Sequence, residues 1–301
     1  MKINMCWLYA ITKYGYPPSI EDTLKVIDEI GDLGFSYMEM EGVREENMKA
    51  VWNARKKIKE KVEERGIKLM NFCPILPSLV SMDKAEREKG FELYKIGLDL
   101  AEYFETELVQ IDSFTPPLKF KGSAPYKEAI SFGLDLKVEI DPEFSWDDQW
   151  KVLVDSFSRA SEMAKERGKK LCVEPRVGEM ISNTDSALRL MDHMGRPENF
   201  GIVLDTGHLN AQKEILPLSV EKLGKKVFYL HVSDNDGKVN EHLGLGKGNI
   251  DWEGVFLALK KHGFDGYVGL DIGNVEDLDR EVVESKLYLE RLFEKLGIDY
   301  K

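Results

Sequence analysis

The chain has 301 residues, a formal net charge of −12 and a hydrophobic content of 43%. This length is typical of an eight-fold βα barrel, and the hydrophobic content is ample for a large core. The acidic balance disfavours a nucleic-acid partner, because such proteins usually present basic surface to the phosphates. No apolar run approaches the ~20 residues of a membrane span and no signal-peptide core follows Met1, so we expect a cytoplasmic protein without a membrane partner.

The apolar pattern predicts eight strand-then-helix units. Strands are expected near residues 3–9, 35–41, 67–73, 107–112, 170–174, 200–205, 226–232 and 266–271. Helices are expected near residues 20–33, 46–65, 84–104, 146–168, 184–194, 216–223, 251–262 and 279–296. This α/β alternation predicts a parallel sheet, and eight units predict closure into a single (β/α)8 TIM barrel that spans residues 1–301 as one domain.

One connection departs from this regular alternation of strand and helix. Residues 113–145 separate the fourth strand from its helix and contain no clear strand or helix pattern. A connection of that length inside a compact domain is usually functional, often as a lid over an active site. We expect this insertion to leave the C-terminal face of the barrel. Alternatively, the insertion has no role in the active site, or it forms a contact between subunits of an oligomer.

The last four predicted strands each end in an acidic or imidazole side chain: Glu174, Asp205, His231 and Asp271. The C-terminal ends of neighbouring barrel strands surround one point. Three carboxylates and one imidazole gathered there would repel one another unless a cation lay between them. Taken singly, Asp205 could cap a helix, His231 could be a core imidazole and Glu174 could pair with Arg176. Taken together, the four residues are predicted metal ligands.

Oxygen donors with one imidazole suit Mn²⁺, our first choice, with Co²⁺, Mg²⁺ or Zn²⁺ as alternatives. A substrate with adjacent carbonyl and hydroxyl groups could chelate such an ion, which would acidify the neighbouring C–H and stabilise the enediolate. Glu174 is the expected base, and Asp271 or His208 would return the proton.

Further side chains are predicted to contact a substrate. Arg176 could hold a phosphate, carboxylate or hydroxyl, or form only a surface salt bridge. His242 lies in a glycine-rich loop and could instead be a mobile exposed histidine. Glu41 and Trp7 come near the ends of the second and first strands and could line a sugar pocket, or belong to the core or rim.

The segments around these residues read VEPRVGE from residue 173, DTGH from 205, HVSDND from 231, HLGLGKGNIDW from 242 and GYVGLDIG from 266. In these motifs the chain resembles the xylose isomerase-like TIM barrel superfamily. That group includes sugar-phosphate isomerases and epimerases, ketose 3-epimerases, hydroxypyruvate isomerases, inosose dehydratases and the family 2 AP endonucleases such as endonuclease IV.

The resemblance implies metal ligation by Glu174, Asp205 and His231. It also matches Asp271 to a carboxylate on the eighth strand that is usually Glu. Because Asp is one methylene shorter than Glu, this departure implies that two-base epimerisation is less efficient than one-base isomerisation or β-elimination. His208 matches a histidine that binds substrate in the ketose epimerases. The sequence departs from those epimerases at Gly237, where they usually carry an arginine that grips the substrate.

These observations predict a metal-dependent isomerase or epimerase of a sugar, keto-sugar or sugar phosphate that acts through a metal-stabilised enediolate. The alternative is a lyase or dehydratase that acts on an oxidised sugar or inosose by β-elimination. An endonuclease IV-like enzyme is a remote third reading, because all five histidines lie beyond residue 190 and Asn240 stands where that enzyme has Asp. A non-catalytic sugar-binding subunit is a fourth. We expect a small carbohydrate partner and a homo-oligomer, either a dimer or a tetramer.

Overall fold

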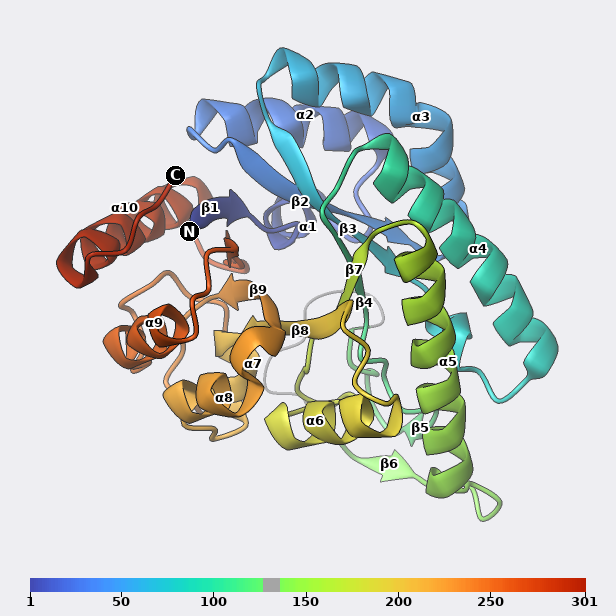
Figure 1. Cartoon of the computed structure of the whole chain (residues 1–301). Coiled ribbons are helices and arrows are strands. Elements are labelled where there is room, and N and C mark those ends of the chain that lie inside the picture. The colour runs from blue at the N-terminus through green and yellow to red at the C-terminus, as the bar shows by residue number, and fades with distance from the viewer. Residues whose placement is uncertain (127–135) are drawn as a thin grey trace.

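The computed structural model describes residues 1–126 and 136–301. Within them, parallel strands close into a barrel in the order β1-β10-β9-β8-β7-β4-β3-β2 (Figure 1). The barrel strands are β1 (Lys2–Met5), β2 (Tyr37–Val43), β3 (Lys68–Ile75), β4 (Leu108–Ile111), β7 (Lys170–Val173), β8 (Phe200–Asp205), β9 (Val227–Val232) and β10 (Tyr267–Leu270). The predicted barrel is therefore confirmed, and chain neighbours lie side by side because each crossover returns to the adjacent strand.

Helices surround the barrel and bury their apolar faces against it (Figure 1). They are α2 (Ile20–Asp32), α3 (Arg44–Glu64), α4 (Lys84–Tyr103), α5 (Trp146–Glu166), α6 (Thr184–His193), α8 (Leu216–Leu223), α9 (Trp252–Lys261) and α10 (Leu278–Leu296). Several begin at a side chain that accepts a backbone N–H of the first turn, as Ser19 does for α2 and Asn183 for α6. Such caps satisfy donors that the helix leaves unpaired, which explains why the predicted helix starts agree closely with the structure.

Short elements follow two of the strands directly and were not predicted. Helix α1 (Leu8–Tyr14) comes after β1, and helix α7 (Thr206–Ala211) comes after β8. The first strand was expected to reach residue 9, but it ends at Met5, and Leu8, Tyr9 and Ala10 are buried as part of a helix. Short apolar runs fit a buried strand and a buried helix equally well, which explains the error. Two 3-10 turns, η1 (Pro77–Val80) and η2 (Gly224–Lys226), complete the described elements.

The long connection after β4 is tied to the barrel at several points. It carries a small antiparallel pair, β5 (Lys119–Phe120) and β6 (Val138–Glu139). Phe114 is buried with its ring 5.9 Å from that of Phe157, and the hydroxyl of Tyr126 donates to the backbone oxygen of Val177 at 2.8 Å. The middle of the predicted insertion, residues 127–135, lies outside the described residues, so a lid over the C-terminal face stays a prediction.

The two termini meet beside β1 (Figure 1). The backbone N–H of Lys301 donates to the oxygen of Met1 at 2.9 Å, and that of Ile3 donates to the oxygen of Lys301 at 3.1 Å. Across residues 1–126 and 136–301, the structure contains no helix with the length and apolar character that a bilayer crossing requires.

Candidate active site

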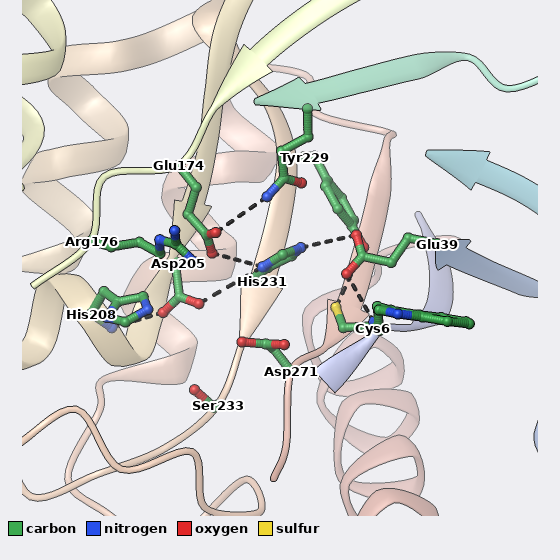
Figure 2. A network of polar contacts seen from close by, with 12 residues as sticks. Cys6, Glu39, Glu174, Arg176, Asp205, His208, Tyr229, His231, Ser233 and Asp271 are labelled. Carbon is green, nitrogen blue, oxygen red and sulfur yellow. Dashed lines mark hydrogen bonds and ion pairs between the residues drawn. The ribbon is translucent and has the colours of Figure 1, made fainter. Parts of the chain in front are cut away.

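The four predicted metal ligands lie together at the C-terminal ends of β7, β8, β9 and β10. One donor atom from each of Glu174, Asp205, His231 and Asp271 lies within 4.8 Å of the other three, and all four residues are buried. Figure 2 shows their side chains directed toward a common centre. Because the four strands are consecutive neighbours in the barrel, residues at their ends converge although the chain separates them widely.

His231 presents a different carboxylate to each of its ring nitrogens. Its Nδ1 lies 2.8 Å from Oε1 of Glu174 and 3.9 Å from Oδ2 of Asp205. Its Nε2 lies 3.2 Å from Oε2 of Glu39, on β2. Burial works against a charged ring, but Cys6 and the carboxylates of Glu174 and Glu39 raise the pKa of His231 well above its ordinary value. Glu39 therefore fixes the ring orientation and leaves Nδ1 facing the cluster.

The cluster has the electrostatic character of a cation site. Oδ1 of Asp205 accepts the backbone N–H of His208 at 2.7 Å, whereas its buried Oδ2 has no hydrogen-bond partner among the described residues. Burial, together with the charges of Asp205 and Asp271, raises the pKa of Glu174 to about 8 despite His231. A divalent cation between these donors would pair with the unpartnered Oδ2 of Asp205. It would also favour the ionised form of Glu174. The donor set thus fits such an ion.

A chain of hydrogen bonds inside the barrel supports this cluster. The amide of Asn71 donates to Oε2 of Glu39 at 3.1 Å and to Oε1 of Gln110 at 2.9 Å. The amide of Gln110 in turn donates to Oε2 of Glu174 at 3.2 Å. Glu39 also accepts the backbone N–H of Trp7 at 3.0 Å, and His231, together with this bond from Trp7, keeps the pKa of Glu39 low against burial.

The sequence analysis missed these supporting residues. A signal was available, because Glu39, Asn71 and Gln110 are polar residues within apolar strand segments. A polar side chain buried in a barrel interior needs a hydrogen-bond partner, so its presence in such a strand points toward a polar network.

Asp271 is held by His242. The Nδ1 atom of His242 lies 2.9 Å from Oδ2 of Asp271 and 2.8 Å from its backbone oxygen. Burial disfavours a charged ring, but Asp271 raises the pKa of His242 to about 9, and His242 lowers that of Asp271 in return. The predicted alternative, a mobile exposed histidine, is wrong, since His242 is buried and lines the pocket.

An open pocket of about 720 Å³ lies at this end of the barrel. Its lining comes from strand ends, from α1 and from the connections after the strands. The lining residues are Leu8, Ile11, Tyr16, Glu39, Glu41, Cys73, Ile75, Gln110, Asp112, Tyr126, Glu174, Arg176, His208, His231, His242 and Asp271. A concave site with a few convergent polar groups is the usual form of a small-molecule site. Four of the predicted substrate-binding residues therefore line this pocket, namely Glu41, Arg176, His208 and His242.

His208 and Arg176 occupy the same side of the pocket as Tyr126. The ring centroids of His208 and Tyr126 are 5.9 Å apart, and burial lowers the pKa of His208 well below its usual value, which keeps it neutral. The guanidinium of Arg176 lies 4.4 Å from the centre of the Tyr126 ring and forms ion pairs with Asp112 and Glu179. Arg176 is thus a pocket residue and not the surface salt bridge that was the alternative.

Trp7 requires a correction. Its side chain is 2% exposed and packs in the hydrophobic core, and it is absent from the lining of the described pocket. The expected contact between the Trp7 ring and a substrate is not supported. The strand ends at Met5, so Trp7 begins helix α1 and contributes its backbone N–H to Glu39 instead.

Comparison with known families identifies this architecture. A sequence model of the family described as xylose isomerase-like TIM barrel matches residues 27–292. The chain belongs to this family. Among solved structures, an Escherichia coli 3-keto-D-glucoside 4-epimerase superposes with a TM-score of 0.74 at 18% identity, covering 97% of this chain and 99% of that one. A D-tagatose 3-epimerase-like protein gives 0.68 at 21% identity over 99% and 98%. At these identities the likeness shows the fold alone.

Sequence relatives cover shorter stretches. An uncharacterized protein of Methanocaldococcus jannaschii is 32% identical over 155 residues, which is 49% of this chain and 53% of that protein. An inosose dehydratase of Lacticaseibacillus casei is 26% identical over 45% of this chain and 51% of its own. An L-ribulose 3-epimerase of a Methylomonas species is 30% identical over 44% of each. The chain therefore spans about half the length of the curated relatives it matches.

Proposed function

We propose that this protein is a divalent-metal-dependent isomerase or epimerase of a sugar or keto-sugar. The observation that carries the proposal is the buried cluster of Glu174, Asp205, His231 and Asp271, in which Oδ2 of Asp205 has no partner among the described residues. The similarity of this chain to the 3-keto-D-glucoside 4-epimerase in fold, and to the L-ribulose 3-epimerase in sequence, supports this proposal. Manganese is our first choice of ion for three carboxylates and one imidazole.

A divalent ion held there would acidify the C–H next to a substrate carbonyl and stabilise the resulting enediolate. Glu174 is the proposed base, because its carboxylate lines the pocket and lies beside the other donors of the cluster. Gln110 and His231 hold both of its oxygens, which orients the side chain. Asp271 is the proposed group that returns the proton, and His208 a neutral hydrogen-bonding group for a substrate oxygen.

A dehydratase is the second candidate, and the pair formed by His242 and Asp271 favours it. Asp271 is one methylene shorter than glutamate, and His242 binds both its side chain and its backbone oxygen. An aspartate restrained in this way is poorly suited to take up a proton from the second face of a substrate carbon. Glu174 would then act alone as base while a hydroxyl leaves, as the relationship to the inosose dehydratase suggests.

The test combines elemental analysis with solvent-deuterium exchange. Purified protein supplied with Mn²⁺ is expected to hold one metal ion per ligand cluster and to exchange deuterium into one carbon of a ketose or inosose. Recovery of an isomeric sugar supports the isomerase or epimerase, whereas loss of water supports the dehydratase. Absence of bound metal after Mn²⁺ addition would overturn the proposal. Protein treated with a chelator serves as the control and is expected to lose exchange.

A further inference from the structure

The loop between β9 and α9, residues 233–251, carries His242 to the ligand cluster and folds around one buried side chain, Asp234. Asp234 comes two positions after the end of β9 and is 1% exposed. A carboxylate that is removed from water in this way is costly unless the protein supplies hydrogen-bond donors for its oxygens. The donors that Asp234 receives show what this residue does in the loop.

Both carboxylate oxygens of Asp234 accept N–H groups from the far end of the loop. Its Oδ2 accepts the backbone N–H of Gly246 at 2.9 Å and the indole N–H of Trp252 at 3.0 Å. Its Oδ1 accepts the backbone N–H of Asn235 at 3.0 Å and that of Ile250 at 3.4 Å. Three of these donors lie 12 to 18 residues along the chain from Asp234. The carboxylate therefore joins the two ends of the loop, through hydrogen bonds of the stronger, charge-assisted kind.

Glycines allow the chain to come this close to Asp234. A Cβ atom at Gly248 would lie 2.2 Å from Oδ1 of Asp234 and 2.2 Å from the backbone oxygen of Asn235, distances that no side chain could occupy. Gly246 has a φ of +84°, in the left-handed region that favours glycine, and this conformation accompanies its hydrogen bond to Asp234. The glycine-rich part of the loop thus serves close packing around one carboxylate.

Backbone hydrogen bonds connect Asp234 to His242. The N–H of Asp234 donates to the oxygen of Leu243 at 2.9 Å, and the N–H of Leu243 donates to the oxygen of Asp234 at 3.0 Å. Leu243 directly follows His242, whose own backbone oxygen accepts the N–H of Gly273 at 3.1 Å. The ring of His242 contacts Asp271 at the same place. His242 is therefore held between Asp234 on one side and the segment after β10 on the other.

Among the described residues, Asp234 belongs neither to the ligand cluster nor to the pocket lining, so any effect on a bound ion must pass through the loop. We infer that Asp234 is a positioning residue for the proposed metal site and that it acts through His242 on Asp271. Residues that orient a metal ligand from behind contribute to affinity because they fix the ligand before the ion binds. The inference rests on the proposed function and gives Asp271 a support comparable to that which Glu39 gives His231.

The experiment is a double-mutant cycle on the full chain, with Mn²⁺ affinity measured by isothermal titration. Asp234→Asn replaces one acceptor oxygen by an amide that can only donate, and is expected to weaken Mn²⁺ binding by ~10-fold. His242→Phe keeps a ring at this position but cannot donate to Asp271. With His242→Phe present, Asp234→Asn is expected to change the affinity by less than ~2-fold, because the connection to Asp271 is already broken. Weakening by the same factor in both backgrounds would show a merely structural role and overturn the inference.

Asp236→Asn is the matched control, since it makes the same change in the same loop at an exposed side chain that pairs with Lys238. Its Mn²⁺ affinity is expected to equal that of the unaltered protein. If circular dichroism shows that Asp234→Asn does not fold, Trp252→Phe removes one donor to Asp234 and is tested in both backgrounds, with an expected loss of ~2- to 10-fold that requires His242.

The two proposals fail in different ways. Unchanged affinity in folded Asp234→Asn, or in Trp252→Phe where that variant replaces it, would overturn the inference and leave the proposed function standing. Absence of Mn²⁺ binding by the unaltered protein would overturn the proposed function, and the inference with it.

Discussion

The Nε2 atom of His231 lies 3.2 Å from Oε2 of Glu39, which stands on the far side of the barrel interior on β2. This contact leaves Nδ1 of His231 directed at Glu174 and Asp205. A carboxylate behind a histidine in this way sets which nitrogen is available for a metal and increases its basicity. The ligand cluster and its support therefore come from opposite halves of the chain.

The first prediction concerns that support. Glu39→Gln is expected to weaken Mn²⁺ binding by ~10- to 100-fold, because the amide cannot hold His231 as the carboxylate does. Isothermal titration at constant pH measures the affinity, and circular dichroism checks that the barrel is retained. The exposed change Glu45→Gln should leave the affinity as in the unaltered protein. Wild-type affinity in Glu39→Gln would show that Glu39 does not position the imidazole.

The second prediction concerns the proposed base. Glu174→Gln keeps an oxygen donor at the cluster but cannot accept a proton from carbon. Deuterium exchange is expected to fall by ~10²- to 10⁴-fold, the usual contribution of a positioned base, while metal stays bound or is only weakened. Elemental analysis of the same sample shows whether the variant has lost its metal or has lost only deuterium exchange. Near wild-type exchange in a metal-loaded Glu174→Gln sample would remove Glu174 from this role.

The third prediction concerns pH. The pKa values of Glu174 and Glu41 are raised to about 8, and that of His242 to about 9, so the folded protein keeps protons that the unfolded chain has lost. Stability of the metal-free protein therefore falls as pH rises toward 8 to 9. His231, whose pKa is also raised, acts in the same direction, whereas the lowered pKa of His208 matters only below its ordinary value.

Bound Mn²⁺ should oppose this fall in stability with rising pH. Binding of Mn²⁺ is expected to displace protons from both Glu174 and His231, so its affinity should rise with pH by up to ~10-fold per pH unit for each proton released. Thermal unfolding with and without Mn²⁺ at about pH 6, 7 and 8 measures both effects, since stabilisation by a ligand follows its affinity. A metal-induced rise in Tm that is the same at each pH would contradict the assignment of Glu174 as a metal ligand.

The fourth prediction concerns Gly207, in the first turn of α7. A Cβ atom at this position would lie 2.5 Å from Oγ of Ser233 and 3.3 Å from Oδ1 of Asp205. Gly207→Ala is expected to destabilise the fold by about 1 to 3 kcal/mol through overpacking and to weaken Mn²⁺ binding by displacing Asp205. Denaturant unfolding and metal titration measure the two effects.

A second substitution makes this prediction specific. Adding Ser233→Ala to Gly207→Ala removes the closest clash and should restore part of the stability. Gly122→Ala, where a Cβ would meet nothing within 4 Å, is the matched control for the loss of a glycine. If the double variant is no more stable than Gly207→Ala, then crowding against Ser233 is not the reason that glycine stands there.

The barrel and its ligand cluster could be predicted because both depend on local pattern. Apolar strand segments that end in Glu174, Asp205, His231 and Asp271 occur in consecutive βα units, and the geometry of a closed parallel barrel brings the ends of such strands together. Helix starts were accurate for a related reason, since caps such as Asn183 act on the backbone within a few residues. The sequence could not decide where β1 ends, because the apolar residues 8–10 suit a strand or a helix.

The sequence by itself thus determined the fold class, the order of the strands and the four residues that meet at the proposed metal site. Only the tertiary structure decided that Glu39 supports His231, that Asp112 and Glu179 neutralise Arg176, and that the Trp7 ring belongs to the core. Apart from the pair of Arg176 and Glu179, these contacts join residues far apart in the chain, and the partners depend on which side chains the closed barrel directs at one another. Local periodicity specifies which face a residue occupies, whereas the packed barrel specifies what that residue meets there.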